Sequence, residues 1–248
     1  MKRFLKSILP DNLVCSIQRF REHYIFGYKR NSYSQAGEDM ILAQLFNEKM
    51  NGFYIDVGAY HPRKYSNTYL FYRRGWCGIN IDASPGSMLL FQRERSRDIN
   101  IEAAVSDKNI KTTFLCYNEP AYNALKSDTK ISNPPPANLI ETVDLSTVRL
   151  DQLIHEHLPA GQAIDFLDID VEGNELAVLQ SNDWSSFRPR VILVEALKQN
   201  MTDVQNSELH RFLTTHEYSL WYKTNYTLFY ISREFINDNL HLYKNHDG

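Results

Sequence analysis

The stretch that decides the fold is Gly52-Phe53-Tyr54-Ile55-Asp56-Val57-Gly58-Ala59. Its apolar part, residues 53–57, predicts a short buried strand that ends where Gly58 follows the carboxylate of Asp56. Glycine allows a tight turn without steric cost, so a ligand can come close to the backbone at such a strand end. The stretch therefore predicts a strand whose carboxyl end forms part of a binding site.

The glycines after this strand are too few to hold a pyrophosphate. Gly58-Ala59-Tyr60-His61-Pro62 does not follow the pattern G-x-G-x-x-G, which disfavours NAD and favours a nucleoside ligand without phosphates. S-adenosylmethionine is a ligand of this kind. Asp82 ends the next predicted strand, where a carboxylate can accept hydrogen bonds from both hydroxyls of a ribose. A strand-end carboxylate that contacts only solvent is the alternative.

Strands alternate with helices from Ser34 onward, and this order predicts an α/β fold with a mostly parallel sheet covered by helices. We expect strands at residues 53–57, 77–81, 99–105, 112–117, 142–148, 164–169 and 191–194, and a closing antiparallel hairpin of residues 218–222 and 227–231. We expect helices at residues 40–46, 69–74, 85–95, 150–157, 175–179 and 207–215. Ligands bind outside the carboxyl ends of such strands, and the residues expected there are Asp56, Asp82, Ala104, Asp168, Asp170 and Glu195.

Four acids lie close together in the segment Asp168-Ile169-Asp170-Val171-Glu172-Gly173-Asn174-Glu175. Because side chains alternate along an extended chain, Asp168 and Asp170 fall on the same side. Carboxylates this close repel one another and need a metal or another cation beside them, such as the sulfonium of the cofactor. Three interpretations stay open: a general base that deprotonates a substrate hydroxyl, a Mg²⁺ site at Asp168 and Asp170, and a cap for the following helix.

The composition is that of an ordinary globular chain, with 248 residues of which 43% are hydrophobic and 23% charged. The net charge of −3 gives no strongly basic surface, so we expect no nucleic acid partner. The three cysteines, Cys15, Cys77 and Cys116, form no C-x-x-C pair, which favours a reducing cytoplasm over a disulfide framework. No apolar run approaches the roughly 20 residues that span a bilayer, and no signal-peptide pattern occurs.

Residues 1–33 are expected to form a basic helical arm in front of one α/β domain at residues 34–248. Residues 1–30 carry a net charge of +5, and their apolar side chains recur at near-helical spacing. Pro10-Asp11 divides this part into two helical pieces. Such an arm suits peripheral contact with an anionic membrane or with a glycan-assembly partner. Helices packed on the domain, with their charges in solvent, are the alternative.

The chain resembles the FkbM-type methyltransferase family over roughly residues 34–197. The stretches that match in order and spacing are Ser34-Gln35-Ala36-Gly37-Glu38-Asp39, Gly52 to Gly58 followed by His61-Pro62, Ser66-Asn67-Thr68, Gly75-Trp76-Cys77-Gly78, Ile164 to Glu175, Asp183-Trp184 and Arg188-Pro189. The resemblance implies a Rossmann-like class I methyltransferase fold and S-adenosylmethionine as cofactor. It also implies O-methylation of a sugar or a related natural product as the usual reaction.

The resemblance further implies roles for individual residues. Asp56 and Gly58 look like the first cofactor motif, and Asp82, followed by Ala83, looks like the ribose-binding acid. The remaining residues assigned to the cofactor side are Gln35, Glu38, Asn67, Thr68 and Ser106. The family often has lysine where this chain has Asp168, and Glu-Pro where it has Asp82-Ala83. The change at residue 168 reverses a charge beside the reacting centre, which favours a metal or a cationic substrate.

We expect in-line methyl transfer from the sulfonium to a hydroxyl oxygen, with Asp168 or Asp170 as the base and His61 as a further candidate. Substrate contacts are expected from Glu172, Glu195 and Tyr122. Tyr122 lies in the polar segment 118–139, which contains Pro134-Pro135-Pro136 and is predicted to be a long loop that shapes the substrate pocket. The acceptor is expected to be a small molecule or a glycan precursor. N-methylation of an amino group and a non-catalytic nucleoside-binding scaffold in a glycan-assembly complex are the alternatives, and the oligomeric state stays open.

Overall fold

The computed structural model describes residues 10–27, 30–46, 49–126, 136–197 and 199–243. The chain divides into two compact units, Met1–Ser32 and Tyr33–Gly248. Within the described part of the first unit, helix α2 (Asp11–Phe20) continues into one turn of π-helix, η1 (Arg21–Phe26). The helical piece predicted before Pro10 and most of the Pro134-Pro135-Pro136 stretch lie outside the described residues.

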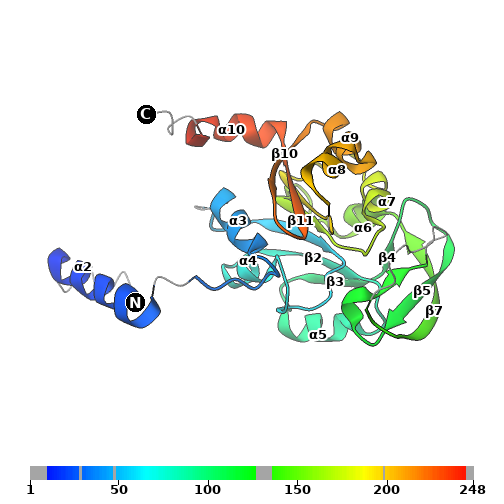
Figure 1. Ribbon diagram of the computed structural model, residues 1–248, viewed down its shortest axis with the longest axis horizontal. Helices are drawn as coiled ribbons and strands as arrows, with labels where there is room; N and C mark the ends of the chain where they lie inside the picture. The colour runs from blue at the N-terminus through cyan, green and yellow to red at the C-terminus, as the bar shows by residue number, and fades with distance from the viewer. Residues whose placement is uncertain (1–9, 28–29, 47–48, 127–135, 198, 244–248) are drawn as a thin grey trace. The chain divides into compact units, whose positions relative to one another are not determined.

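A sheet of seven strands forms the centre of the second unit, in the order β10-β11-β9-β8-β1-β2-β3 (Figure 1). Their bounds are β1 Phe53–Val57, β2 Cys77–Asp82, β3 Ile99–Glu102, β8 Phe166–Ile169, β9 Val191–Glu195, β10 Tyr218–Lys223 and β11 Thr227–Ser232. The parallel strands are β1, β2, β3, β8 and β9, whereas β11 runs antiparallel to both β9 and β10. This arrangement confirms the predicted Rossmann-like methyltransferase fold with its C-terminal antiparallel hairpin.

Helices cover both faces of this sheet, as the alternation of elements predicts. The helices are α3 Glu38–Leu45, α4 Tyr69–Arg73, α5 Ser87–Glu94, α6 Leu150–His157, α7 Glu175–Gln180, α8 Met201–Asn206, α9 Glu208–Thr215 and α10 Arg233–Tyr243. Successive side chains of β1 enter different apolar clusters: Ile55 packs with residues of α6, α7 and α9, and Tyr54 packs with residues of α3, α4 and α10. Burial on both faces explains why the central strands are continuous apolar runs.

A second, four-stranded sheet in the order β4-β7-β5-β6 lies beside the first and corrects the sequence prediction (Figure 1). The single strand expected at residues 99–105 is divided at Ala103 into β3 and β4 (Ala104–Val105), and β4 pairs with β7 (Leu139–Val148). Ala104 therefore does not end a strand of the main sheet. β5 (Lys111–Tyr117) and β7 are antiparallel partners, and most of β7 is exposed, unlike the central strands of the main sheet.

Two further predictions need correction. The segment 118–139, expected to be a loop, contains a 3-10 turn, η2 (Pro120–Tyr122), and the two-residue strand β6 (Ala124–Leu125) before β7 begins. Helices α8 and α10 were not predicted. Helix α8 begins with a capping box in which the Asn200 side chain accepts from the backbone of Asp203 and the Asp203 side chain accepts from that of Asn200.

Candidate active site at the carboxyl edge of the sheet

The predicted strand-end acids of β1 and β8 lie side by side. Asp56 is the register partner of Asp168 across these two parallel strands, and each residue is 5% exposed. Thr68 donates a hydrogen bond of 2.9 Å to Asp56, and the Asn67 amide donates one of 2.8 Å to Asp168. Both donors come from the turn that leads into α4. This turn therefore brings two residues predicted for the cofactor side to the two acids.

The charges of these two acids have no basic partner among the ion pairs of the described residues. Burial raises the pKa of Asp56 to about 6, while the Thr68 hydrogen bond and the nearby Arg95 oppose the rise. Burial and then the charge of Asp56 raise the pKa of Asp168 well above its usual value. Two such carboxylates fit a cationic ligand group, because a nearby positive charge favours their ionised form.

Gly58 is required here for a reason that sequence reasoning did not foresee. Its backbone has φ of +86°, and a Cβ atom at this position would lie 1.7 Å from the carbonyl oxygen of Asp170. The close approach seen in the structure is thus between two strand ends, β1 and β8. Gly58 allows the chain after β8 to cross directly over the turn after β1, which draws the acidic segment toward Asp56.

Asp82 is buried at the end of β2 and organises the two turns that flank it. One carboxylate oxygen accepts from the backbone N–H of Tyr60 at 2.8 Å, and the other accepts from that of Ser84 at 2.7 Å. Each carboxylate oxygen can accept a further hydrogen bond. The side chain therefore fits the two hydroxyls of a ribose, and Ala83 lies half-buried next to it.

A second acidic group is formed by residues that follow β8 and by the last residue of β9. Asp170, Glu172 and Glu195 each offer a carboxylate oxygen, and these oxygens lie within 4.8 Å of one another. Burial of its carboxyl group and then the charge of Glu175 raise the pKa of Asp170 to about 7, and a hydrogen bond with Glu195 opposes the rise. Burial and the neighbouring acids raise the pKa of Glu172 to about 8 and that of Glu195 to about 11. Glu195 therefore holds a proton at neutral pH, while Asp170 titrates there.

Of the acids in this segment, Glu175 is the one that caps the turn before the following helix. Its carboxylate accepts from the backbone N–H of Gly173 at 2.8 Å and of Val171 at 3.4 Å, which closes the turn before α7. Asp170 is an exposed residue, whereas Asp168 is buried. The two acids that the sequence placed on one side thus have different surroundings.

The other residues predicted for the site differ in their burial and in their hydrogen-bond partners. Glu38 is buried and accepts from the Ala36 backbone and from the Thr224 hydroxyl, so it ties α3 to the β10–β11 turn. The Nδ1 atom of His61 accepts from the backbone N–H groups of Arg63 and Lys64, which leaves only Nε2 for another role. Gln35 is exposed, Ser106 is buried after β4, and Tyr122 is half-buried in η2.

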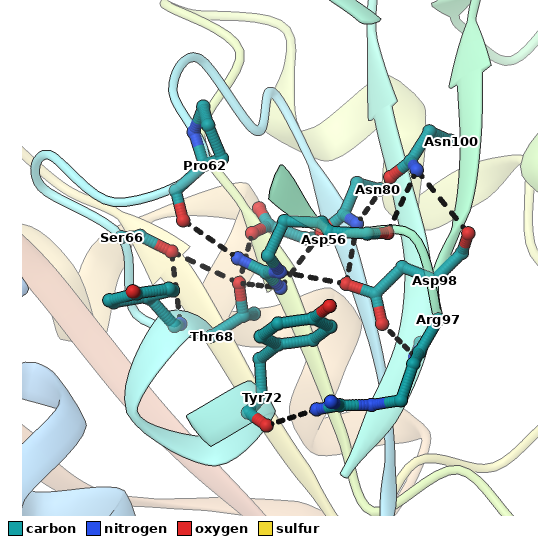
Figure 2. Close-up of polar contacts among 12 residues, drawn as sticks. Asp56, Pro62, Ser66, Thr68, Tyr72, Asn80, Arg97, Asp98 and Asn100 are labelled. Atoms are coloured by element: carbon teal, nitrogen blue, oxygen red, sulfur yellow. Dashed lines mark hydrogen bonds and ion pairs between the residues drawn. The ribbon is translucent and has the colours of Figure 1, made fainter. Parts of the chain in front are cut away.

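Sequence reasoning missed the polar network behind these acids, which includes Tyr54, Asn80, Arg95 and Asp98 (Figure 2). Arg95 is followed closely by Arg97, and both are neighbours of exposed polar residues, so the sequence alone gave no sign that one of them is buried. Strand β2 likewise contains Asn80 between two isoleucines, at a position that is 0% exposed. A polar residue inside an apolar strand is the one signal that could have indicated a buried network.

Comparison with known proteins identifies the family. The profile of the methyltransferase FkbM domain matches residues 56–220, more than half of the chain, and this range includes Asp56, Asp82, Asp170 and Glu195. A search of curated proteins gave no significant match. Among solved structures, a candidate O-methyltransferase from Klebsiella pneumoniae is similar over 93% of this chain and 95% of its own, with 12% identity and a TM-score of 0.39, a likeness too low to carry an argument. The matched domain shows that the chain belongs to the FkbM methyltransferase family and is an S-adenosylmethionine-dependent methyltransferase.

Proposed function

We propose that this enzyme methylates a hydroxyl oxygen of a sugar, a glycan precursor or a related natural product, and that Asp170 removes the hydroxyl proton. The observation that carries the proposal is the position of Asp170, exposed at the end of β8 and hydrogen-bonded to Glu195. A general base works best when its pKa lies near the operating pH, and that of Asp170 is raised to about 7. Asp168 is less suited because it is buried and already accepts from Asn67.

The cofactor, when bound, supplies a methyl group on a positively charged sulfur that is a good leaving group. The task of the chain is therefore to align the acceptor oxygen and to take up its proton. Asp56 and Asp168 would lie toward the cationic methionine end of the cofactor, and Asp82 would hold the ribose hydroxyls. The Oδ1 atom of Asn67 is buried without a hydrogen-bond partner, and it offers an acceptor to a ligand group at the same place.

The acceptor side is formed by Asp170, Glu172 and Glu195, with Tyr122 as a further contact. Carboxyl and carboxylate oxygens bind the hydroxyl groups of sugars through hydrogen bonds, which supports a polyhydroxylated acceptor. The Asn123 amide donates to the Ser84 hydroxyl at 3.0 Å, so the segment after η2 is joined to the turn that follows Asp82. This contact supports a role for Tyr122 near the cofactor side of the sheet edge.

A divalent ion at the second acidic group is the alternative to a shared proton. The oxygens of Asp170, Glu172 and Glu195 are of the kind that Mg²⁺ prefers. This set differs from the predicted pair of Asp168 and Asp170, because Asp168 is turned to Asn67. A bound divalent ion would make activity sensitive to a chelator, whereas a shared proton would not.

We also propose that the N-terminal arm contacts an anionic membrane surface. Leu13, Ile17 and Phe20 recur at helical spacing along α2 and are exposed, and residues 1–30 carry a net charge of +5. This combination is typical of helices that lie in the interface plane. None of the described helices is long and apolar enough to cross a bilayer. Sedimentation with vesicles that contain phosphatidylglycerol, compared with pure phosphatidylcholine vesicles, tests the proposal, and equal binding to both or to neither would contradict it.

Product analysis tests the acceptor class. The full-length protein is incubated with methyl-labelled S-adenosylmethionine and with nucleotide sugars, glycolipid precursors and amino-sugar analogues, and products are located by mass spectrometry and NMR. We expect the label on an oxygen of a sugar-containing acceptor. Label found only on nitrogen would replace O-methylation by N-methylation, without changing the assignment of the cofactor.

A further inference from the structure

Arg95 is a charged side chain that the structure buries completely. It is 0% exposed and forms an ion pair of 2.8 Å with Asp98, which is equally inaccessible at its side chain. Burying an arginine is costly unless its donors are satisfied. Arg95 lies at the end of α5, and its guanidinium contacts the segment that leads into α4.

The guanidinium joins three parts of the chain: the loop at Asp98, strand β1 and the segment of residues 62–68. Besides Asp98, it donates to the carbonyl of Pro62 at 3.0 Å, to the hydroxyl of Tyr54 in β1 at 2.7 Å and to the hydroxyl of Thr68 at 3.1 Å. In Figure 2 the Pro62 carbonyl, the Thr68 hydroxyl and the Asp98 carboxylate all point toward the centre of the network. A planar fork with five donors can make these bonds at once, whereas an ammonium cannot.

The network ends on a cofactor-side acid. The Thr68 hydroxyl accepts from Arg95 and donates to Asp56, so one oxygen atom links the guanidinium to this carboxylate. Asp98 is itself held by the backbone N–H of Gly78, by the Asn80 amide and by the Tyr54 hydroxyl. The Arg95–Asp98 ion pair is therefore fixed to β1 and β2 through Asp98, and Arg95 connects it to Pro62 and Thr68.

We propose that Arg95 is a positioning residue for S-adenosylmethionine: it fixes the turn at Pro62 and, through Thr68, orients the Asp56 carboxylate for the cofactor. Arg95 does not touch the ligand in this account. Its contribution is that the turn and the carboxylate are already in place before binding, which reduces the ordering cost of the complex. The proposal does not depend on which acceptor the enzyme uses.

A purely structural ion pair would have a different consequence. It would stabilise the fold, and its loss would lower the melting temperature without changing affinity in the molecules that remain folded. Lys49 gives a matched control, because it pairs with buried Asp165 at the amino end of β8, away from the cofactor edge. Lys49→Met should lower stability and leave cofactor affinity unchanged.

The test is a double-mutant cycle on binding of S-adenosylhomocysteine, measured by calorimetry at a temperature where every variant is folded. Arg95→Lys and Thr68→Val should each weaken binding by about tenfold, and the double variant should be little weaker than either. Thr68→Ser, which keeps the hydroxyl, should bind like the wild type. Independent losses that multiply in the double variant, or unchanged affinity in Thr68→Val, would overturn the proposal. If Arg95→Lys does not fold, the contrast between Thr68→Val and Thr68→Ser decides it.

Discussion

The Glu195 carboxyl group at the end of β9 is hydrogen-bonded to the Asp170 carboxylate, directly after β8. Two acids can form such a bond only when one of them carries a proton. Burial and the charges of Asp170, Glu172 and Glu175 raise the pKa of Glu195 well above its usual value, so the proton is assigned to Glu195. A neutral acid thus supports a carboxylate that can accept a proton from substrate.

This pairing predicts that two substitutions of Glu195 differ. Glu195→Gln keeps a neutral donor to Asp170, so turnover at pH 7 should stay within about threefold of wild type, whereas Glu195→Ala removes the donor. Loss of the donor raises the pKa of Asp170 further and should shift the acidic limb of the pH–rate profile upward. Profiles of kcat for the two variants measure this. Identical profiles would show that the hydrogen bond has no part in activity.

Glu172 predicts a pH dependence of stability. Burial raises its pKa from 4.5 to about 8, so the folded state holds this proton more tightly than the unfolded chain. The stabilisation is fully present below pH 4.5 and is lost as the pH rises through about 8. We expect a higher melting temperature at pH 6 than at pH 9, and a smaller difference in Glu172→Gln. A variant with the same pH dependence as wild type would contradict this assignment.

At Gly58, the steric cost of an added Cβ atom can be measured separately from the cost of a positive φ. Gly58→Ala places a Cβ 1.7 Å from the Asp170 carbonyl oxygen, while Gly75, with φ of +103°, has open space around it. Gly75→Ala should therefore cost only the conformational part, about 1–2 kcal/mol of unfolding free energy. Gly58→Ala should cost clearly more and also weaken cofactor binding. Denaturant unfolding compares the two, and equal costs would remove the close approach as the reason for Gly58.

A chelator separates the shared proton from a metal. Because Asp170 and Glu195 are held by a proton between them, we expect full activity in EDTA and no gain from added Mg²⁺. Loss of activity in EDTA, with recovery on adding Mg²⁺ but not on adding sodium, would replace the proton by a divalent ion at Asp170, Glu172 and Glu195.

The central sheet could be predicted from the sequence because its strands are buried on both faces. Residues 53–57 and 191–194 are apolar runs, and their carboxyl ends carry the acids that mark the site. The second sheet could not be assigned in the same way. β7 is mostly exposed, and only its pairing with β5 and β4 shows that it belongs to a separate sheet.

The acids of the candidate site could be predicted from the sequence, but the residues that contact them could not. Asp56, Asp82 and Asp170 follow strands in the sequence, and parallel strands bring such residues to one edge. The partner of Asp170, Glu195, lies far along the chain, and their hydrogen bond depends on β8 and β9 being neighbours. Arg95 was missed because an arginine among other arginines predicts an exposed side chain.

Asp170→Asn tests the proposed mechanism most directly, with turnover and cofactor affinity measured on the same preparation. The amide keeps the size of the side chain and cannot take up a proton, so kcat should fall by about 10²-fold or more. Affinity for S-adenosylhomocysteine should change by less than about threefold, because the proposed role of Asp170 is toward the acceptor. Asp168→Asn is the matched control, and it should weaken cofactor binding instead. Turnover of Asp170→Asn close to that of wild type would contradict the assignment of Asp170 as the base.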